Sequence, residues 1–468
     1  MNNNTKNANS FDGPFNFKGV TKLDAPYDIY KLDCKNIISN SDAFKLRSAL
    51  LTMKFKKKSC DLYSFGQSPD FYRISNKDKP DEVQQFLLVL AEMKKKIATF
   101  LEKTFNKTTS VSCSMYNHGD YLLCHDDRVD DRSVAFIYYL NYDWLNEWGG
   151  TLDVYSIDEN YNAKEIVNSI NPEFNTMIFF PVGQHTYHQV AENVSNFSRI
   201  SINGWFHCDS LSWKPYDQQV ELPTPIFLPI TVSKTKTYAS EFIETIFEDP
   251  DYREIVRESF VGDGFIMLEG FFKQEMVDIF SNEIFSNDLK WQVNGPLNKR
   301  NYKYVDLNDL PDKVLFVVNL MKTDFMFEFL KECTGINLSG VSVEVQRWHG
   351  GHYMVSGGND GVDHLNVLSV YLFFSQCFGQ MSDNIKDDLH YVFEERHTLQ
   401  PKFACKPQDN TIFLVKRDSD MESYVKYCKK VDGHAWTVIV ANYLIADNLK
   451  CSVGIEMKEL SEHHNCDQ

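Results

Sequence analysis

The sequence predicts an α+β protein that contains two copies of one β fold, each preceded by helices. Three observations support this prediction. The chain has 468 residues, which is more than one hydrophobic core usually supports, so two domains of roughly 200 residues are expected. Short β-branched and aromatic runs gather at 110–206 and again at 340–444, each after helix signals. The runs of the two groups can also be aligned with each other.

The first helices are predicted from apolar spacing. An Asn-rich, disordered tail at 1–12 precedes a helix from Ser41 to about Met53. A second helix follows Pro80 and an acidic first turn. Its apolar residues recur at i, i+3, i+4 and i+7, which predicts a buried stripe. The stripe comprises Val83, Phe86, Leu87, Leu90, Ile97 and Leu101.

The strands of the first copy are predicted from five runs separated by turn residues. They are 110–116, 133–141, 151–158, 175–182 and 199–207. Such close spacing is typical of a barrel or a double-sheet jelly roll. These patterns divide the chain into a first domain at 13–208, a Pro-rich linker at 209–240, a second domain at 241–449 and a tail at 450–468. In the second domain, helices are predicted at Glu241–Phe247 and Gln274–Phe285.

The internal repeat can be tested by its register. "HGDYLLCHDD" at 118–127 precedes "SVAFIYYLN", and "GGHYMVSGGND" at 350–360 precedes "VLSVYLFFS". Thr176 precedes His188 by as many positions as Thr411 precedes Ser423. This alignment sets three pairs of residues against each other: Gly357 and His125, Asn359 and Asp127, Ser423 and His188. The second copy therefore cannot bind whatever the first binds through these side chains.

Composition limits the classes of partner. The net charge of −17 works against nucleic-acid binding and favours a basic partner. The eleven cysteines lack a CxxC pair, so reduced thiols are expected rather than disulfides or structural zinc. Because the sequence has neither a long apolar span nor an apolar signal core, a soluble intracellular protein without membrane contact is expected.

A metal site is suggested by an HxD pattern, which occurs three times. The pairs are His118/Asp120, His125/Asp127 and His207/Asp209. The first resembles a turn and the last follows the final strand of its copy, whereas His125 lies between an apolar run and a strand. Two residues that are two apart on a strand face the same side. With a second histidine, they would form the 2-His-1-carboxylate arrangement of non-haem Fe(II) sites. A solvated acidic loop is the alternative.

The second histidine is expected from the last two runs of the first copy. His188 begins a run that leads to a strand, and Arg199 opens that strand, so both can reach one end of a barrel. An arginine in an apolar interior needs an acidic partner. Its fork-shaped guanidinium suits a small dicarboxylate, and a carboxylate of the protein itself is the alternative partner. His185 competes as the ligand, and the repeat alignment favours His188.

These residues resemble the iron- and 2-oxoglutarate-dependent prolyl hydroxylases. The resemblance depends on His125-x-Asp127, on "IYYLN" ending at 141, on Trp148 with "GGTLDVYSID", on "YHQV", and on Arg199 in "SRISINGWFH". With "GPLNKR" at 295–300 and the degenerate second copy, the chain is most similar to the prolyl 3-hydroxylases of a small-subunit ribosomal protein. That family includes the yeast termination and polyadenylation protein. The resemblance spans residues 20 to 445.

The resemblance implies a fold, cofactors and site residues. It implies two tandem double-stranded β-helix (jelly-roll) domains that use Fe(II), 2-oxoglutarate and O2, with ascorbate as a candidate reductant. The implied iron ligands are His125, Asp127 and His188. Arg199 would bind the distal carboxylate of 2-oxoglutarate, and Tyr116 and Tyr139 would line the cosubstrate pocket. Because Tyr138 and Tyr139 alternate in face, only one can point inward.

The resemblance also implies a substrate, a prolyl residue of a basic small-subunit ribosomal protein at the decoding centre. Translation accuracy or termination would depend on it, in the cytoplasm, the nucleus or both. The second copy, with His434 near the position of Arg199, would be a silent scaffold or docking surface. The acidic charge would speed capture of a basic peptide. The alternatives are the same chemistry on another substrate, a non-catalytic interaction protein, and zinc hydrolysis, which lacks an HExxH helix here.

Overall fold

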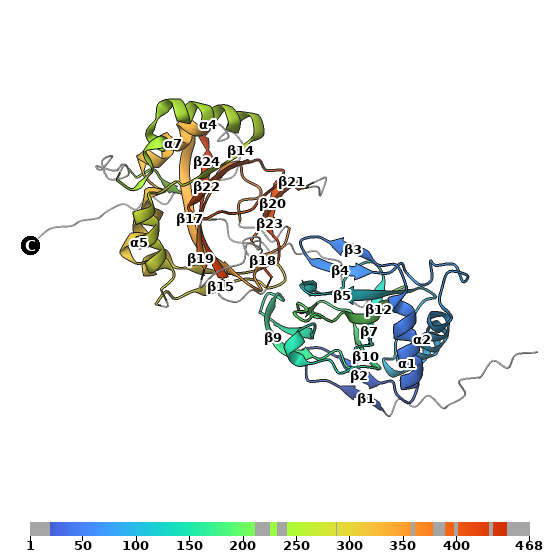
Figure 1. The fold of residues 1–468 in the computed structure, drawn as a ribbon. Coiled ribbons are helices and arrows are strands. Elements are labelled where there is room, and N and C mark those ends of the chain that lie inside the picture. Colours follow the sequence, from blue (N-terminus) through green and yellow to red (C-terminus); the bar gives the residue numbers. More distant parts are fainter. Residues whose placement is uncertain are drawn as a thin grey trace, which may run out of the picture.

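The computed structural model describes residues 19–210, 225–231, 241–286, 288–356, 361–377, 389–396, 401–429 and 434–446. The predicted tails at 1–12 and 450–468 lie outside these ranges, as does most of the predicted linker. We call residues 19–210 the N-terminal half and residues 241–446 the C-terminal half. Figure 1 shows each half as a curled antiparallel sheet with helices on its outer face.

The N-terminal half contains one sheet in the order β1-β2-β10-β7-β12-β5-β4-β6-β11-β8-β9, with β3 paired to β4. Its strands are β1 (Val20–Lys22), β2 (Tyr30–Asp33), β3 (Lys56–Ser59), β4 (Tyr63–Gln67), β5 (Thr109–Tyr116), β6 (Tyr121–His125), β7 (Arg132–Tyr139), β8 (Leu152–Ile157), β9 (Ala163–Ile170), β10 (Thr176–Pro181), β11 (His188–Val190) and β12 (Arg199–His207). A short 3-10 helix, η2 (Asn146–Trp148), precedes β8.

Two helices cover the outer face of this sheet, as predicted. The hydroxyl of Ser39 caps α1 (Asn40–Leu51) by accepting from the backbone N–H of Asp42. Pro80 and an acidic first turn begin α2 (Asp81–Phe100). The predicted stripe of α2 is buried against strands β7, β10 and β12, except that Leu101 is only partly buried. The opposite face of the sheet is therefore left to enclose a cavity.

The C-terminal half contains a second sheet in the order β14-β22-β19-β24-β17-β16-β18-β23-β20-β21. Its strands are β13 (Leu228–Pro229), β14 (Phe265–Glu269), β15 (Gln292–Asn294), β16 (Arg300–Val305), β17 (Leu338–His349), β18 (Tyr353–Met354), β19 (Val367–Cys377), β20 (Tyr391–Glu395), β21 (Pro401–Cys405), β22 (Thr411–Arg417), β23 (Met421–Val425) and β24 (His434–Ile445). Its helices are η3 (Thr245–Glu248), α4 (Pro250–Asp263), α5 (Gln274–Ile284), η4 (Leu307–Asp309), α6 (Asp312–Leu320) and α7 (Asp324–Thr334).

Strand order confirms the predicted repeat. From β2 to β9 the first sheet follows the same path as the second does from β14 to β21, so β6 corresponds to β18 and β11 to β23. The register agrees as well: Val190 pairs with Leu122 in the first sheet, and Val425 pairs with Met354 in the second. Ser423 therefore occupies the position of His188. Gly357 and Asn359, which were aligned with His125 and Asp127, lie outside the described residues.

Three expectations about the C-terminal half need correction. The helix predicted at Glu241–Phe247 contains the 3-10 helix η3 rather than one regular α-helix. Leu228–Pro229, within the predicted linker, pairs with β17 and so belongs to the second sheet. Helices α4, α6 and α7 were not predicted, although Asp249, Pro250 and Gly264 give α4 a regular cap at each end.

Figure 1 shows the two halves side by side. Strands β6 and β9 of the first half contact β18, Leu297 and the residues after β23 of the second. The backbone N–H of Ser356 donates to Asp61 at 2.8 Å, and the Tyr427 hydroxyl donates to Glu192 at 3.2 Å. The halves are therefore joined by buried polar and apolar contacts. Within the described residues, no helix combines the length and apolarity needed to cross a bilayer.

Candidate metal centre and cosubstrate pocket

A β-bulge turns His125 toward the inside of the first sheet. Strands β11 and β6 pair His188 with His125 and Val190 with Leu122. Between these pairs, two residues of β6 (Leu123 and Cys124) oppose one of β11 (Gln189), which rotates the end of the bulged strand. As a result Leu122 and His125 both line the same cavity, although an odd spacing would place them on opposite faces of a regular strand.

Asp127 reaches the site by a different route from the one predicted. Strand β6 ends at His125, and Asp127 has a left-handed backbone with φ of 63°. The period-two argument for the pair is therefore wrong, because only one of the two residues lies on the strand. Asp126 points elsewhere and pairs with Arg128 at 2.7 Å. The left-handed turn, which aspartate tolerates better than most residues, returns the Asp127 carboxylate to the inner face.

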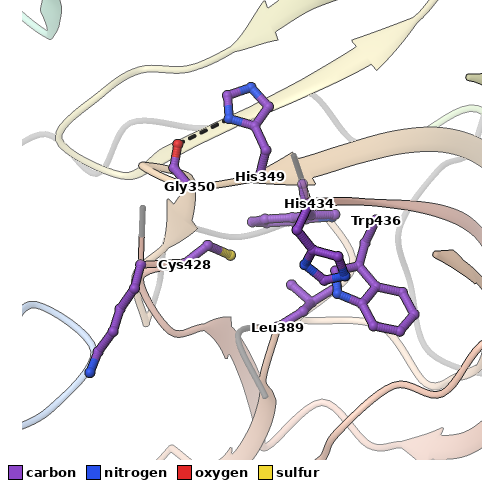
Figure 2. Close-up of a pocket in the computed structure, with 8 residues that line it drawn as sticks. His349, Gly350, Leu389, Cys428, His434 and Trp436 are labelled. Atoms are coloured by element: carbon purple, nitrogen blue, oxygen red, sulfur yellow. Dashed lines mark hydrogen bonds between the residues drawn. The ribbon is translucent and has the colours of Figure 1, made fainter. Parts of the chain in front are cut away.

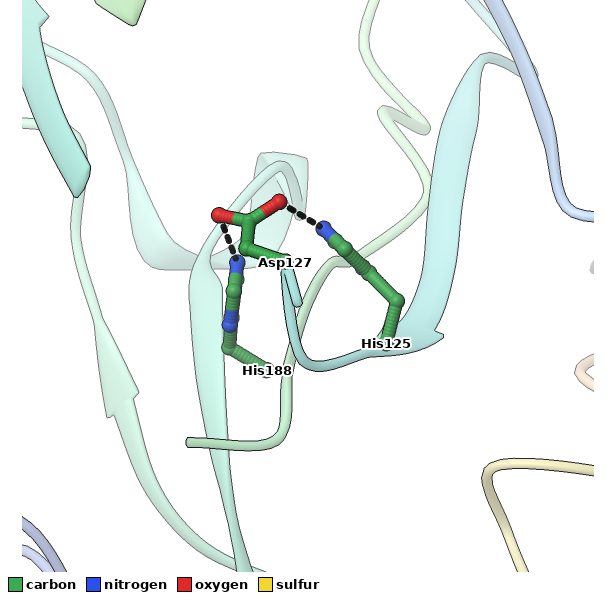
Figure 3. A group of neighbouring side chains, drawn as sticks. All are labelled: His125, Asp127 and His188. Carbon is green, nitrogen blue, oxygen red and sulfur yellow. Dashed lines mark ion pairs between the residues drawn. The ribbon is translucent and has the colours of Figure 1, made fainter. Parts of the chain in front are cut away.

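The three predicted ligands lie together (Figure 3). Nε2 of His125 is 3.4 Å from Oδ1 of Asp127, and Nε2 of His188 is 3.5 Å from Oδ2. One ligand atom from each residue lies within 4.8 Å of the other two. Two imidazoles and one carboxylate on one side of an ion leave its other positions open, which fits non-haem Fe(II).

Hydrogen bonds orient both imidazoles. Nδ1 of His125 is 2.8 Å from the carbonyl oxygen of Leu123, and Nδ1 of His188 is 2.7 Å from that of Thr186. Because a carbonyl oxygen only accepts, each neutral ring has its proton on Nδ1 and its lone pair on Nε2. Both lone pairs therefore face Asp127, as metal ligands require.

Electrostatics favour the metal-binding protonation states of His188 and Asp127, but not that of His125. Burial and repulsion from His125 lower the pKa of His188 to about 4, so this ring is neutral at neutral pH. Burial opposes ionisation of Asp127, but its hydrogen bond with His125, the charge of that ring and the charge of Arg132 hold its pKa well below the ordinary value. Burial would also lower the pKa of His125, yet its contact with Asp127 raises it.

Trp205 is a contact that the sequence analysis did not identify. Its indole N–H donates to Oδ2 of Asp127 at 3.0 Å, and the guanidinium of Arg132 lies 3.7 Å from its ring centroid. The indole therefore orients the carboxylate from behind, as a residue next to a metal ligand commonly does. The only signal in the sequence was its position in "GWFH", six residues after Arg199.

Arg199 is buried without an acidic partner in the described part of the chain. Only 1% of its surface is exposed. Nε donates to the carbonyl oxygen of Gly150 at 2.6 Å and Nη1 to the hydroxyl of Ser201 at 3.3 Å, whereas Nη2 has no hydrogen-bond partner among the described residues. A buried cation with a free donor is costly unless an anion joins it. The site therefore fits the carboxylate of 2-oxoglutarate.

Two tyrosines enclose this guanidinium. It lies 4.9 Å from the ring centroid of Tyr116 and 5.2 Å from that of Tyr139, within the range of cation–π attraction. The Tyr139 hydroxyl is buried without a partner in the described residues. Tyr138 points the other way, where its hydroxyl donates to Asn175 at 2.7 Å. Of the alternating pair, Tyr139 is thus the one that faces the site.

Gly150 permits the close approach of Arg199 to the backbone. Its φ is +67°, and a Cβ atom there would lie 2.9 Å from Cδ of Arg199. Both the left-handed backbone and the lack of space exclude a larger residue. The "GG" at 149–150 therefore has a physical reason in the packing of the arginine.

One cavity of about 460 Å³ connects the metal centre to Arg199, a volume that suits a small cosubstrate and part of a substrate. Its wall includes Tyr63, Phe65, Ala135, Leu152, Phe180 and Val190. At its edge lie Lys58, Arg128 and Arg132. The cavity thus has a mostly apolar wall, to which the metal-binding triad and Arg199 add polar groups.

The other candidate histidines lie outside this arrangement. His118 is exposed, and its predicted partner Asp120 pairs instead with Lys57. His207 contacts Asp131 at 2.5 Å rather than Asp209. His185 stacks on Tyr161, with ring centroids 4.7 Å apart, and is absent from the metal-binding group. The structure therefore selects His188 over His185.

In the second sheet, aromatic residues replace the cosubstrate residues. Trp436 pairs with Trp348 as Arg199 pairs with Tyr116, and Phe373 pairs with Thr411 as Tyr139 pairs with Thr176. Trp436, Trp348 and Phe373 thus stand at the positions of Arg199, Tyr116 and Tyr139. His434, which was predicted near the position of Arg199, lies two residues before the matching one.

The space at this position is almost filled. The cavity beside Trp348 and Trp436 holds only about 10 Å³, compared with about 460 Å³ in the N-terminal half. Figure 2 shows His349, Cys428, His434 and Trp436 around it. Among the described residues, an indole thus replaces the guanidinium, and the remaining space is too small for a dicarboxylate.

Comparison with known proteins agrees with this division. Residues 111–207 match the 2OG-Fe(II) oxygenase superfamily, and residues 234–448 match the family described as oxoglutarate and iron-dependent oxygenase degradation C-term. The chain is 33% identical to prolyl 3-hydroxylase sudestada1 of Drosophila melanogaster, over 81% of this chain and 75% of that protein. It is 32% identical to prolyl 3-hydroxylase OGFOD1 of Xenopus laevis, over 83% of this chain and 81% of that protein.

A further relative is prolyl 3-hydroxylase OGFOD1 of Mus musculus, at 32% identity over 65% of this chain. The match spans little more than half of that protein, 55% of its length. The frog and fly relatives are each covered over more than two thirds of their length. The chain therefore belongs to the prolyl 3-hydroxylase family of 2-oxoglutarate- and Fe(II)-dependent oxygenases, which use Fe(II), 2-oxoglutarate and O2.

Proposed function

We propose that this oxygenase hydroxylates a prolyl residue of a basic small-subunit ribosomal protein at the decoding centre, and that translation accuracy or termination depends on the product. One atom of O2 enters the prolyl ring as a hydroxyl group. The other oxidises 2-oxoglutarate, which leaves as succinate and CO2. Fe(II), when bound, supplies the activation of O2 that couples the two oxidations.

The observation that supports this proposal most is the pairing of a metal-binding triad with a buried arginine that has a free donor. Arg199 binds the distal carboxylate of 2-oxoglutarate through Nη2 and thereby sets the position of the cosubstrate. His125 and His188 present fixed lone pairs, so little reorganisation accompanies metal binding. The apolar wall around Leu152 and Phe180 keeps bulk water from the reacting groups.

The substrate class is supported by two further observations. The relatives with matching chains are named prolyl 3-hydroxylases. The chain has a net charge of −17, which attracts a basic protein such as a ribosomal subunit component and raises the rate of encounter. Action in the cytoplasm, the nucleus or both follows from such a substrate.

The test is a single-turnover reaction with a decoding-centre peptide. The protein is mixed with Fe(II) and 2-oxoglutarate without oxygen, air is admitted, and the peptide is analysed by mass spectrometry. We expect a gain of one oxygen atom on proline that is lost in His125→Ala. His118→Ala is the matched control, because this exposed histidine of another HxD pair lies outside the site, and it should keep full turnover.

Two results would contradict the proposal in different ways. Succinate without a hydroxylated peptide would mean that another molecule is the substrate. Turnover that is unchanged between low and physiological salt would contradict electrostatic capture, because screening weakens long-range attraction.

A further inference from the structure

The C-terminal half covers the outer face of the strand that holds His125. On β6, Leu122 and His125 face the cavity, while Tyr121 and Leu123 face outward. The two outward side chains are 5% and 2% exposed because they pack against Tyr353 and Val355 of the C-terminal half. The ring of Tyr121 also lies 4.4 Å from that of Tyr427, centroid to centroid. The iron-binding strand is thus enclosed between the cavity and the other half.

A second contact reaches the segment that follows His188. The hydroxyl of Tyr427 donates to the carboxylate of Glu192 at 3.2 Å, and Glu192 is only 4% exposed. The backbone carbonyl of Glu192 accepts from the N–H of Gly150 at 3.1 Å. The carbonyl of Gly150 in turn accepts from Nε of Arg199 at 2.6 Å. One tyrosine of the C-terminal half therefore connects to the end of β11 and, through two backbone groups, to the cosubstrate arginine.

A third contact fixes the neighbourhood of Cys124, the residue before His125. Cys124 and Ala163 share a buried cluster into which Leu297 packs. The N–H of Leu297 donates to the carbonyl of Ala163 at 3.0 Å, and the side chain of Asn298 accepts from the N–H of Ala163 at 3.1 Å. The C-terminal half therefore packs against Tyr121 and Leu123 of β6 and joins the buried cluster that contains Cys124.

The two halves use equivalent positions for this contact. In the aligned registers Tyr121 corresponds to Tyr353 and Leu123 to Val355. Glu192 corresponds in the same way to Tyr427, because each lies two residues after the valine that ends its strand. The interface thus resembles that of an isologous dimer fused into one chain. The C-terminal half has lost the pocket but has kept the strands that make this face.

We propose that the C-terminal half positions the metal centre, and that Tyr427 is the main positioning residue. Because β6 ends in a bulge with a left-handed turn after it, its own ladder fixes the His125–Asp127 segment only in part. Packing from outside supplies the remaining constraint. This inference rests on the proposed iron site, but it concerns the C-terminal half, to which the proposed reaction assigns no task.

The first experiment measures β6 directly in the metal-free protein by hydrogen exchange of the amides of 121–125. Tyr427→Phe removes one hydrogen bond and keeps the ring. Tyr443→Phe is the matched control, because it also removes a buried hydrogen bond of the C-terminal half, from Tyr443 to the carbonyl of Met321 at 2.6 Å. Both residues belong to the helix-side core of that half and not to the clusters at the interface. We expect faster exchange in β6 with Tyr427→Phe alone, because the lost bond loosens Glu192, and the next residue, Asn193, donates its N–H to the carbonyl of Asp120, directly before β6, at 3.0 Å.

The second experiment measures Fe(II) binding without oxygen or cosubstrate. A coupling of the usual size between contacting elements weakens binding about two- to thirty-fold in Tyr427→Phe and leaves it unchanged in Tyr443→Phe. Val355→Ala, which trims the packing against Leu123, should act in the same direction. Each variant is first checked for a cooperative unfolding transition.

The outcomes separate this inference from the proposed function. Unchanged β6 exchange together with unchanged Fe(II) affinity in both interface variants would overturn the positioning role. An equal effect of Tyr443→Phe would overturn it too, because the effect would then be general destabilisation. If the wild-type protein bound no Fe(II), the proposed function would fail, and the exchange of β6 would still decide whether the C-terminal half holds this strand.

Discussion

Replacement of Arg199 by methionine should separate ligand binding from stability. Methionine keeps most of the length and apolar volume of the side chain but removes the charge and every donor. In the protein alone, Arg199 is a buried cation with an unused Nη2 and no carboxylate within ion-pair distance in the described residues. The arginine therefore destabilises the protein in the absence of 2-oxoglutarate, and its charge is compensated when the cosubstrate binds.

The magnitudes follow from this geometry. Replacement of a buried ion pair by apolar residues is neutral or stabilising by about 1 to 4 kcal/mol. We apply the same range to this single buried cation and subtract about 1 kcal/mol for the hydrogen bond lost at Gly150. We therefore expect the free energy of unfolding to change by an amount between a loss of about 1 kcal/mol and a gain of about 3 kcal/mol. Without the cation, the binding free energy of 2-oxoglutarate becomes less favourable by about 3 to 5 kcal/mol, which weakens its affinity roughly 150- to 5,000-fold.

Arg417→Met is the matched control. Arg417 is also 1% exposed, but it pairs with the buried carboxylate of Asp363. Removal of one partner from such a pair leaves the other uncompensated and destabilises by about 3 to 5 kcal/mol. Arg417→Met should therefore lose at least about 2 kcal/mol more stability than Arg199→Met, although the wild-type residues are equally buried.

The assay combines denaturant unfolding of the metal-free protein with anaerobic titration of 2-oxoglutarate in the presence of Fe(II). The reasoning is refuted if Arg199→Met loses more than about 3 kcal/mol of stability, because the arginine would then be a structural element of the barrel. It is equally refuted if 2-oxoglutarate binds the variant within a few-fold of the wild type.

Three further predictions concern single contacts. Trp205→Phe removes the hydrogen bond to Asp127 and should weaken Fe(II) binding about 10- to 100-fold in an anaerobic titration, with little change in unfolding. Tyr138→Phe should cost about 1 kcal/mol of stability in denaturant unfolding because it removes a core hydrogen bond. Tyr139→Phe should leave stability unchanged and weaken 2-oxoglutarate binding. The reverse result would mean that Tyr138, and not Tyr139, faces the site. Burial and repulsion from a neighbouring histidine lower the pKa of His352 to about 2, so below about pH 6.5 the unfolded state binds a proton that the folded state does not. The free energy of unfolding should therefore fall by about 1.4 kcal/mol per pH unit as the pH drops below that value. His352→Asn should flatten this slope in unfolding measured at several pH values, and an unchanged slope would contradict the prediction.

The strand core and the repeat could be predicted because their signals are local. Strands such as β7 and β10 are buried on both faces and appear as continuous apolar runs, which the sequence displays openly. The repeat followed from the spacing of Thr176 and His188, and the register of the second sheet confirms it. The choice of His188 over His185 rested on this alignment and on the position of Arg199 one strand-turn further along the chain.

The remaining elements lack such signals. Strand β3 has the sequence KKKS and β9 is mostly exposed, so neither shows an apolar pattern. Their strand geometry comes from pairing with neighbours that are distant in sequence. Strand β11 has only three residues, too few for any periodicity.

The geometry of the triad could not be predicted in detail for the same reason. The bulge in β6 depends on how two strands pair, and the left-handed φ of Asp127 depends on the turn that follows. The sequence argument reached the correct residues through a regular strand that does not extend to Asp127. Trp205 and the contacts of Tyr427 are tertiary, and only the folded chain displays them.

Anomalous diffraction from crystals grown with Fe(II) in the absence of oxygen would test the central claim most directly. The account predicts one iron peak per chain, at about 2.0 to 2.2 Å from Nε2 of His125, Nε2 of His188 and a carboxylate oxygen of Asp127. A peak that is bound elsewhere, a second peak in the C-terminal half, or coordination through His185 would contradict it.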